Sequence, residues 1–256
     1  DRDAADLSLA EELGRRIAGA VEADRVAGRE AQLQSVTAQL AAAGTLVEAA
    51  TALVDGVRAA LVARTVGVYA GGPAAPLRLV RRAGPGLPDD TVRLDVDSPQ
   101  AHAVRAAEPV WLPDGDALLA RFPHAPDPGT GTDRALAAIP LRTGDLVVGL
   151  LVAEFGSARE FPADERDFAL ALTGQAAQAF ERAALADQRW RLAQTLQRAL
   201  LPPTLPGLDR IGLAARYLPA MREFQSGGDW YDVVALDATR VAMAVGDVVG
   251  QGPAAA

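Results

Sequence analysis

The sequence predicts an α+β protein in two parts that are joined by a long helix. Three observations predict it: helical and strand patterns alternate between about residues 45 and 160, a heptad pattern follows over about 162–201, and two short apolar runs then flank a turn near residue 238. The chain has 256 residues, half of them apolar. This length and composition fit one or two domains, each with its own core.

Composition excludes several classes of protein. The net charge of −8 and the pI near 4.9 argue against partners such as nucleic acid or anionic membranes. The chain has no cysteine, which excludes disulfides, thiol catalysis and cysteine-linked chromophores. The longest apolar stretch, Leu146 to Phe155, is too short to span a bilayer, and no signal peptide opens the sequence. We therefore expect a cytoplasmic protein.

Residues 1–44 are expected to be helical, because apolar residues recur there at helical spacing. The members of the first stripe are Leu9, Leu13, Ile17 and Val21. A similar pattern begins at Phe168, so we interpret 1–44 as a signalling helix that ends an upstream sensor domain. Such a helix would pair with that of a second copy; packing on its own domain is the alternative.

Residues 45–162 are expected to form one domain of alternating helices and strands. The expected elements are helices over Leu46 to Ala60 and Pro99 to Ala107, and strands over Thr65 to Ala70, Leu77 to Ala83, Pro109 to Leu112, Ala135 to Leu141 and Leu146 to Phe155. Ser98 is the expected N-cap of the second helix. The last strand is almost wholly apolar, which is typical of a central strand buried on both faces.

A long loop is expected from Asp114 to Asp133, which is rich in Gly, Pro and Asp. It could cover a ligand pocket, or be an ordinary mobile loop. His102 and His124 could bind a haem iron, although surface histidines are the simpler interpretation. Three aromatic residues could either line such a pocket or pack in the core: Tyr69, Trp111 and Phe122.

This order of elements, with the strand Ala138 to Leu141, the hairpin Gly144 to Leu151 and the helix start at Phe161 to Glu165, resembles a GAF domain. The resemblance implies a sheet of about six antiparallel strands, with helices on one side and a ligand pocket on the other, and a sensory role. Members of the family bind cyclic nucleotides, tetrapyrroles, haem or small metabolites. The sequence does not identify the ligand of this domain.

Residues 163–201 are expected to form a linker helix that pairs with a second copy as a coiled coil. Steps of four and three residues define a heptad seam made mostly of alanine: Leu172, Ala176, Ala179, Ala183, Ala186, Trp190 and Ala193. Each small residue contributes little burial, so the seam could shift or rotate. Pro202 and Pro203 end the helix.

A β-hairpin is expected at the end of the sequence. Val233 to Leu236 and Val241 to Val245 are its arms, with turn residues Asp237 to Arg240 between them. A turn centred on Ala238 sets Asp229 opposite Asp247, with Cβ atoms roughly 5 Å apart. Like charges at paired positions favour a cation between them, and oxygen ligands suit Mg²⁺ or Mn²⁺. Solubilising aspartates at both ends of a simple hairpin are the alternative.

Four sequence blocks in order resemble the start of a SpoIIE-type phosphatase domain of the PPM (protein phosphatase 2C-like) family. The blocks are Leu196 to Pro203, Ala215 to Ala220, Gly227 to Asp232 and Gly246 to Gly252. The resemblance implies an α/β/β/α sandwich over residues 202–256 and beyond, with a two-metal site that hydrolyses phosphoserine or phosphothreonine directly. It also implies an anti-sigma factor antagonist in its phosphorylated form as substrate.

The resemblance assigns roles to individual residues. Asp229 and Asp247 would be catalytic metal ligands, and Val248 would offer its backbone carbonyl. Four glycines would let the backbone approach the ions and the phosphate: Gly227, Gly228, Gly250 and Gly252. Members of the family need further aspartates downstream, so we expect the two-metal site to be incomplete in this polypeptide and the polypeptide alone to be inactive. A non-enzymatic GAF scaffold with an incomplete phosphatase-like end is the alternative.

Overall fold

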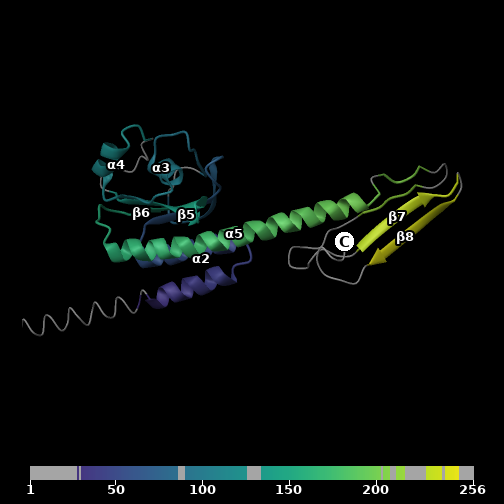
Figure 1. Cartoon of the computed structure of the whole chain (residues 1–256), viewed down its shortest axis with the longest axis horizontal. Coiled ribbons are helices and arrows are strands. Elements are labelled where there is room, and N and C mark those ends of the chain that lie inside the picture. The colour runs from purple at the N-terminus through teal and green to yellow at the C-terminus, as the bar shows by residue number, and fades with distance from the viewer. Residues whose placement is uncertain are drawn as a thin grey trace, which may run out of the picture. The chain divides into compact units, whose positions relative to one another are not determined.

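The structure is a computed structural model that describes residues 28, 30–85, 90–125, 134–202, 204–207, 212–216, 229–237 and 240–247. The chain divides into two compact units, Asp1–Ala183 and Ala184–Ala256. Helix α5 (Ala163–Leu200) begins in the first unit and ends in the second (Figure 1). Each unit is described by itself.

The first unit is built on a six-stranded sheet in the order β3-β2-β1-β6-β5-β4, in which every neighbouring pair is antiparallel. The strands are β1 (Thr65–Ala70), β2 (Leu77–Ala83), β3 (Thr91–Val92), β4 (Val110–Leu112), β5 (Leu136–Thr143) and β6 (Leu146–Glu154). The expected sheet of about six strands is thereby confirmed. Strand β6 is central, as its apolar sequence predicted, and the two-residue strand β3 was not predicted.

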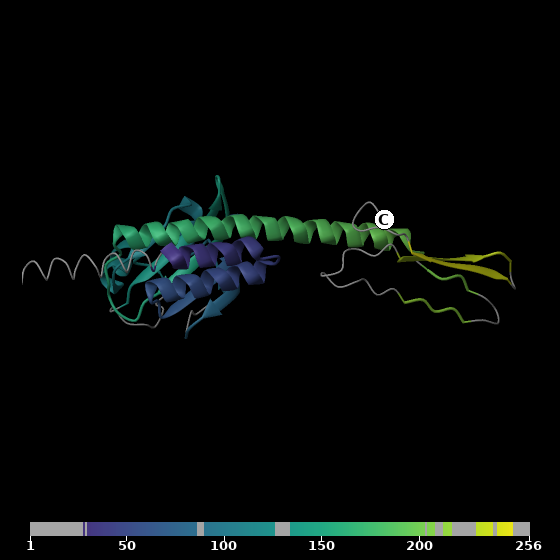
Figure 2. The ribbon, with the colours of Figure 1, turned by 90° about the horizontal axis from the view of Figure 1, so that it is seen from below.

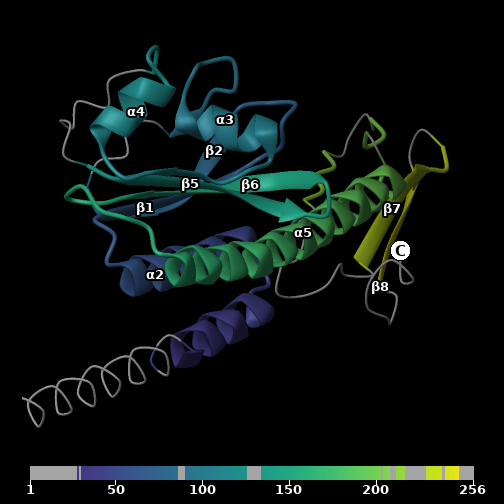
Figure 3. The same ribbon diagram turned by 60° about the vertical axis from the view of Figure 1, so that its left-hand side comes forward.

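Helices cover both faces of this sheet, whereas the sequence resemblance implied helices on one side only. The helix formed by residues 30–42, helix α2 (Leu46–Leu61) and the first part of α5 pack on one face, which we call the α2/α5 side. Helices α3 (Pro99–Ala106) and α4 (Gly115–Arg121) lie on the other, the α3/α4 side (Figure 3). From below, the three helices of the α2/α5 side run next to one another across the sheet (Figure 2).

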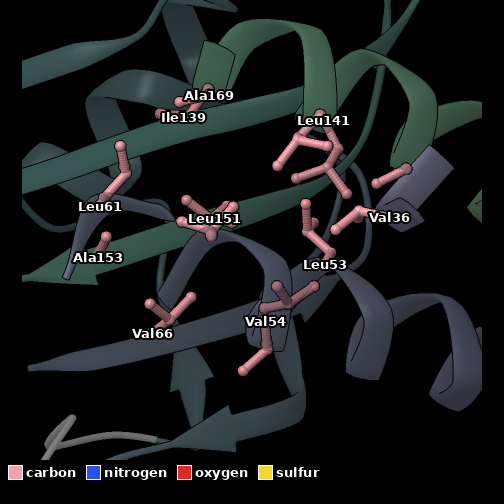
Figure 4. Close-up of a cluster of buried hydrophobic side chains, with 14 of the residues drawn as sticks. Val36, Leu53, Val54, Leu61, Val66, Ile139, Leu141, Leu151, Ala153 and Ala169 are labelled. Carbon is pink, nitrogen blue, oxygen red and sulfur yellow. The ribbon is translucent and has the colours of Figure 1, made fainter. Parts of the chain in front are cut away.

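The larger core fills the α2/α5 side. Leu53 and Val54 of α2 are fully buried there, beside Ile139 of β5 and Leu151 of β6 (Figure 4). Helix α2 forms because its apolar residues recur on one face and its first turn is capped. Thr45 and Glu48 complete a capping box, in which each side chain accepts a hydrogen bond from the backbone N–H of the other residue.

The helix of residues 30–42 approaches α2 very closely at one glycine. A Cβ atom at Gly56 would lie 2.5 Å from Cγ2 of Val36 and 3.0 Å from its Cγ1. Val36 and Leu40 are both buried in the same core as α2. This part of the expected N-terminal helix therefore packs on its own domain, whereas residues 1–27 lie outside the described residues.

Helix α4 corrects the prediction of an uninterrupted loop from Asp114 to Asp133. Asp114 is an N-cap, and its Oδ1 accepts a hydrogen bond of 2.7 Å from the backbone N–H of Ala117. The many Gly, Pro and Asp residues obscured a short run of good helix formers, Ala117 to Arg121, behind a good capping residue. Residues 126–133 of the expected loop lie outside the described part of the chain.

Arg159 anchors the start of α5. Its side chain pairs with Glu165 in the first helical turn, and its Nη1 donates to the carbonyl of Leu61 at the end of α2 over 2.9 Å. The guanidinium also lies 4.6 Å from the ring centroid of Phe155. On the main chain, the N–H of Arg159 donates to Pro113, directly before α4. One residue therefore connects the loop that leads into α4 with two helices of the opposite side.

Candidate functional site

The second unit contains a two-stranded hairpin of β7 (Asp229–Ala235) and β8 (Val241–Asp247). The pairing runs from Asp229↔Asp247 to Ala235↔Val241 without a bulge. This is the register that the sequence predicts, although both strands extend further toward the open end than expected. The alternation of a β-strand assigns positions 229 and 247 to one face, and positions 230 and 246 to the other.

The turn of the hairpin is held by Asp237 and Arg240. Oδ1 of Asp237 accepts a 2.8 Å hydrogen bond from the backbone N–H of Arg240, and Oδ2 pairs with the Arg240 Nε at 2.5 Å. The N–H of Leu236 donates to the carbonyl of Arg240 over 2.9 Å. Both residues were expected in the turn, and the hydrogen bonds between them stabilise it.

Trp230 packs against Gly246, its partner on the opposite strand. A Cβ atom at position 246 would lie 2.5 Å from the indole Nε1 and 2.6 Å from Cε2, so the ring occupies the space that any other residue would fill. Sequence reasoning assigned no role to this pair. A glycine inside an apolar strand, opposite an aromatic residue, was the available signal, since such glycines mark close approaches.

The remaining predicted residues of this site are not in the described part of the chain. Gly227, Gly228, Val248, Gly250 and Gly252 all lie outside the described residues. Among the residues that are described, no three His, Cys, Asp or Glu side chains gather closely enough to hold a metal ion. A metal-binding role for Asp229 and Asp247 stays a prediction, with their Cα pairing as its structural basis.

The α3/α4 side of the six-stranded sheet carries the second candidate region. An apolar cluster fills it, to which Tyr69 and Phe122 contribute; both are almost fully buried. Trp111 lies on the α2/α5 side instead, where its ring centroid is 5.2 Å from that of Phe161. The three aromatic residues considered as a pocket lining are therefore divided between the two faces of the sheet.

His102 lies in α3, on the α3/α4 side of the sheet, and His124 follows α4. His102 of α3 packs edge-on against Phe122, with ring centroids 5.6 Å apart, and its Nε2 is 3.3 Å from Nη2 of Arg121. A guanidinium can only donate, so this contact requires the unprotonated Nε2 of His102 as acceptor. His124 is exposed in the segment after α4. Neither position gives a reason to expect an iron ligand.

Glu154 is a buried carboxyl group near the end of β6, with only 7 % of its surface exposed. It follows Leu150 and Val152 of the α3/α4 cluster in strict alternation, so it shares their face. Burial raises the pKa of Glu154 above its usual value, against the opposing effect of the positive charges of Arg134 and Arg64. Its partners across the ladder, Thr65 and Leu136, offer it no charge.

The predicted seam of α5 has two environments. Leu172, Ala176 and Ala179 are buried in the core of the first unit. Past Ala183, the seam position Ala186 is exposed and Trp190 is half-buried, while Ala193 is buried. Two leucines beside the seam, Leu185 and Leu192, are 47 % and 60 % exposed. Pairing with a second copy stays a prediction, and it applies to the part of α5 beyond Ala183.

None of the described helices combines the length and the apolar character needed to cross a bilayer.

Solved structures with the same fold include three bacterial examples. The GAF domain of a phosphoenolpyruvate-protein phosphotransferase from Coxiella burnetii is 19% identical, with a TM-score of 0.54 over 62% of this chain and 96% of that one. The corresponding Acinetobacter domain is 17% identical, with a TM-score of 0.52 over 60% and 93%. A free methionine-R-sulfoxide reductase from Neisseria meningitidis, in complex with its substrate, is 19% identical, with a TM-score of 0.53 over 62% and 91%.

At these identities the likeness shows the fold alone. The family model described as "GAF domain" matches residues 33–181, which is more than half of the chain. This range covers the six-stranded sheet and also includes part of the 30–42 helix and the first half of α5, both of which bury residues in the α2/α5 core. The chain therefore belongs to the GAF domain family.

Proposed function

We propose that this protein couples a GAF sensor to a metal-dependent phosphoserine protein phosphatase of the SpoIIE type, in the PPM family. The observation that carries the proposal is the Cα pairing of Asp229 with Asp247 inside the block sequence Gly-Asp-Trp-Tyr-Asp…Gly-Asp. Its substrates would be phosphorylated anti-sigma factor antagonists, which the sequence resemblance suggests.

The physical argument starts from charge. Two aspartates at paired positions of an antiparallel ladder repel each other, unless a cation lies between them. Paired positions have Cβ atoms about 5 Å apart, which suits two carboxylates that share one or two Mn²⁺ or Mg²⁺ ions. The donor set is all oxygen, as these ions prefer. The carbonyl of Val248 would complete one side, and the glycines around it would leave room for phosphate.

Divalent ions held there would supply a nucleophile at neutral pH and stabilise charge on the phosphoryl oxygens. The hairpin residues would position the ions. Tyr231 and Val233 follow Asp229 on the same face and are only partly buried. Their Cα partners on that face, Val245 and Met243, are 87 % and 68 % exposed, so the face is open to solvent and to ions.

Regulation would act through α5. The helix begins with Leu172 and Ala176 packed in the GAF core and continues to Leu200 as one element. We propose that two copies pair along α5 beyond Ala183, and that a ligand-dependent change in the GAF domain alters this pairing. A small-residue seam has little burial to resist such a change.

The metal site can be tested by titrating Mn²⁺ into the chain and following free Mn²⁺ by electron paramagnetic resonance. We expect one class of site that is lost in Asp229→Asn and in Asp247→Asn. Asp232→Asn is the matched control, because Asp232 lies on the same strand but its partner is Ala244. Equal Mn²⁺ binding by all four proteins would contradict the proposal.

A non-enzymatic GAF scaffold is the second candidate function. The observation that favours it is the GAF core itself, which buries residues of the 30–42 helix, of α2 and of the first half of α5. A scaffold would form the same dimer, would bind no Mn²⁺ at the hairpin, and would be indifferent to the aspartate substitutions.

A further inference from the structure

We propose that Trp230 and Gly246 hold the hairpin in the one register that sets Asp229 opposite Asp247. The use made of the aspartate pair rests on the proposed function, but the pairing itself does not. In this view Trp230 is a positioning residue: it lies on the face opposite to the aspartates and acts on them through the alignment of the two strands.

The register needs such support because of its charges. Like charges at paired positions destabilise an antiparallel ladder by up to about 1 kcal/mol. Asp229 and Asp247 end the ladder, where strand pairs open most readily. Before any cation binds, their repulsion therefore favours opening or slippage at this end. A two-stranded hairpin on its own is marginally stable, so a repulsion of about 1 kcal/mol is enough to change which residues of the two strands pair.

The adjacent pair supplies the opposing preference. The indole of Trp230 covers Gly246 so closely that a Cβ atom there would lie 2.5 Å from Nε1 and 2.8 Å from Cζ2. Gly246 is the one glycine in Val241–Asp247. A slip of one residue would set Trp230 against Val245 or Asp247, each with a Cβ in the space that the ring needs. Only one register accommodates the ring, and it is the register that pairs the aspartates.

The turn defines the register independently from the other end. Asp237 and Arg240 close it with two hydrogen bonds between them. The turn lies at the far end of the ladder from Asp229, so its influence on the open end passes through six intervening pairs of residues, whereas the Trp230 pair is adjacent to the aspartates. The turn and the tryptophan therefore hold opposite ends of the same ladder.

The chain has no cysteine, so a disulfide between two introduced cysteines reports strand pairing without competing disulfides. Tyr231→Cys with Val245→Cys reports the observed register, because these two residues are Cα partners on the face away from the indole. Tyr231→Cys with Ala244→Cys reports chance collisions and one-residue slippage. Both pairs are oxidised in the full chain, in the presence of a chelator, and the disulfide yields are compared.

We expect Trp230→Ala and Gly246→Ala to lower the in-register yield, relative to the offset pair, about two- to fivefold, the range that cross-strand pair energies imply. Val234→Ala is the control: Val234 lies on the same face as Trp230, is 49 % exposed, and has Ala242 as its partner. An unchanged yield ratio in both Trp230→Ala and Gly246→Ala would overturn the proposal, as would an equal loss in Val234→Ala.

The same variants separate this inference from the metal site. If Trp230→Ala and Gly246→Ala lower the disulfide yield while the parent chain binds no Mn²⁺, the role of Trp230 in setting the register is supported and the metal proposal fails. If the parent chain binds Mn²⁺ and Trp230→Ala binds it with unchanged affinity, Trp230 does not position the aspartates and the inference fails alone. Trp230→Phe, which keeps an aromatic ring, should recover part of the yield that Trp230→Ala loses.

Discussion

Arg159 and Glu165 form an ion pair that ties the segment after β6 to the first turn of α5. Their side chains are 25 % and 10 % exposed, and Arg159 also donates to the carbonyl of Leu61. Because helix α5 is the element that would carry a signal out of the GAF domain, its start has to be fixed to the domain. Partly buried ion pairs with additional hydrogen bonds can supply such a fixed point.

Arg159→Ala is expected to lower the free energy of unfolding of the GAF domain by about 2–3 kcal/mol, because it removes a partly buried ion pair with Glu165, a hydrogen bond to the carbonyl of Leu61 and the packing of the guanidinium on Phe155. Urea unfolding measures this change. The matched control is Arg93→Ala, which removes an ion pair with Asp95 whose two side chains are both 67% exposed. That change should cost less than about 0.5 kcal/mol. Similar losses in the two variants would contradict the anchoring role.

Glu154→Gln is expected to stabilise the domain at neutral pH and to do so less in acid. Burial raises the pKa of Glu154 above its ordinary value of 4.5, so the folded state holds this proton more tightly than the unfolded state. Stability therefore falls as the pH rises from about 4.5 through the folded pKa, and the penalty is complete above it. Thermal melts should show a gain of about 1–3 °C at pH 7.5.

The gain of Glu154→Gln should become small by pH 4, where most of the carboxyl group is protonated in both states. Glu160→Gln makes the same chemical change on an exposed residue and should leave the melting temperature unaltered at both values. A loss of stability at pH 7.5 in Glu154→Gln would show that the carboxylate is stabilising, as a charged partner of Arg134 or Arg64.

Two helical glycines should respond in opposite directions to alanine. At Gly56 the new Cβ would meet Val36 at 2.5 Å, so Gly56→Ala should push the 30–42 helix from α2 and cost about 1–3 kcal/mol. At Gly174 of α5 nothing lies within 4 Å of the new atom, so Gly174→Ala should gain up to about 1 kcal/mol of helix stability. Chemical denaturation distinguishes the two, and a cost at both sites would contradict the described helix packing.

Pairing of two copies along α5 predicts a selective effect of charge. Leu192→Asp places a carboxylate beside the seam at a residue that is 60 % exposed, and should weaken self-association at least about tenfold. Leu119→Asp is the control, since Leu119 of α4 is 56 % exposed and lies away from α5. Sedimentation velocity gives both values. Equal dissociation of the two variants would contradict pairing along this helix.

Much of the fold could be predicted because local signals agree with the tertiary structure. The apolar run of β6 predicted its central place, and Ser98 with Pro99 predicted the start of α3. Helix α4 was missed because its Asp114 N-cap and four-residue apolar run lie among turn-forming residues. The two-residue strand β3 carries too few residues for any periodicity.

In the hairpin, the pairing of the strands could be predicted from the sequence, but the side-chain contacts across it were not. Its register follows from the spacing of two apolar runs around a turn, and Asp229 with Asp247 could therefore be placed as partners. The same register pairs Trp230 with Gly246, but the spacing does not show that the indole ring lies over the glycine, so this contact was not predicted. Likewise, the heptad spacing of α5 could not reveal that Leu172 and Ala176 are buried within their own domain.

The most direct test of a metal site at the hairpin is to locate Mn²⁺ on the chain. In a ¹⁵N-labelled sample, substoichiometric Mn²⁺ broadens the amide signals nearest to its site. We expect Asp229, Trp230, Gly246 and Asp247 to lose intensity first, and Asp229→Asn to abolish this pattern. Broadening that begins elsewhere, for example at Asp114 and Asp116 of α4, or no selective broadening at all, would contradict a metal site at the hairpin.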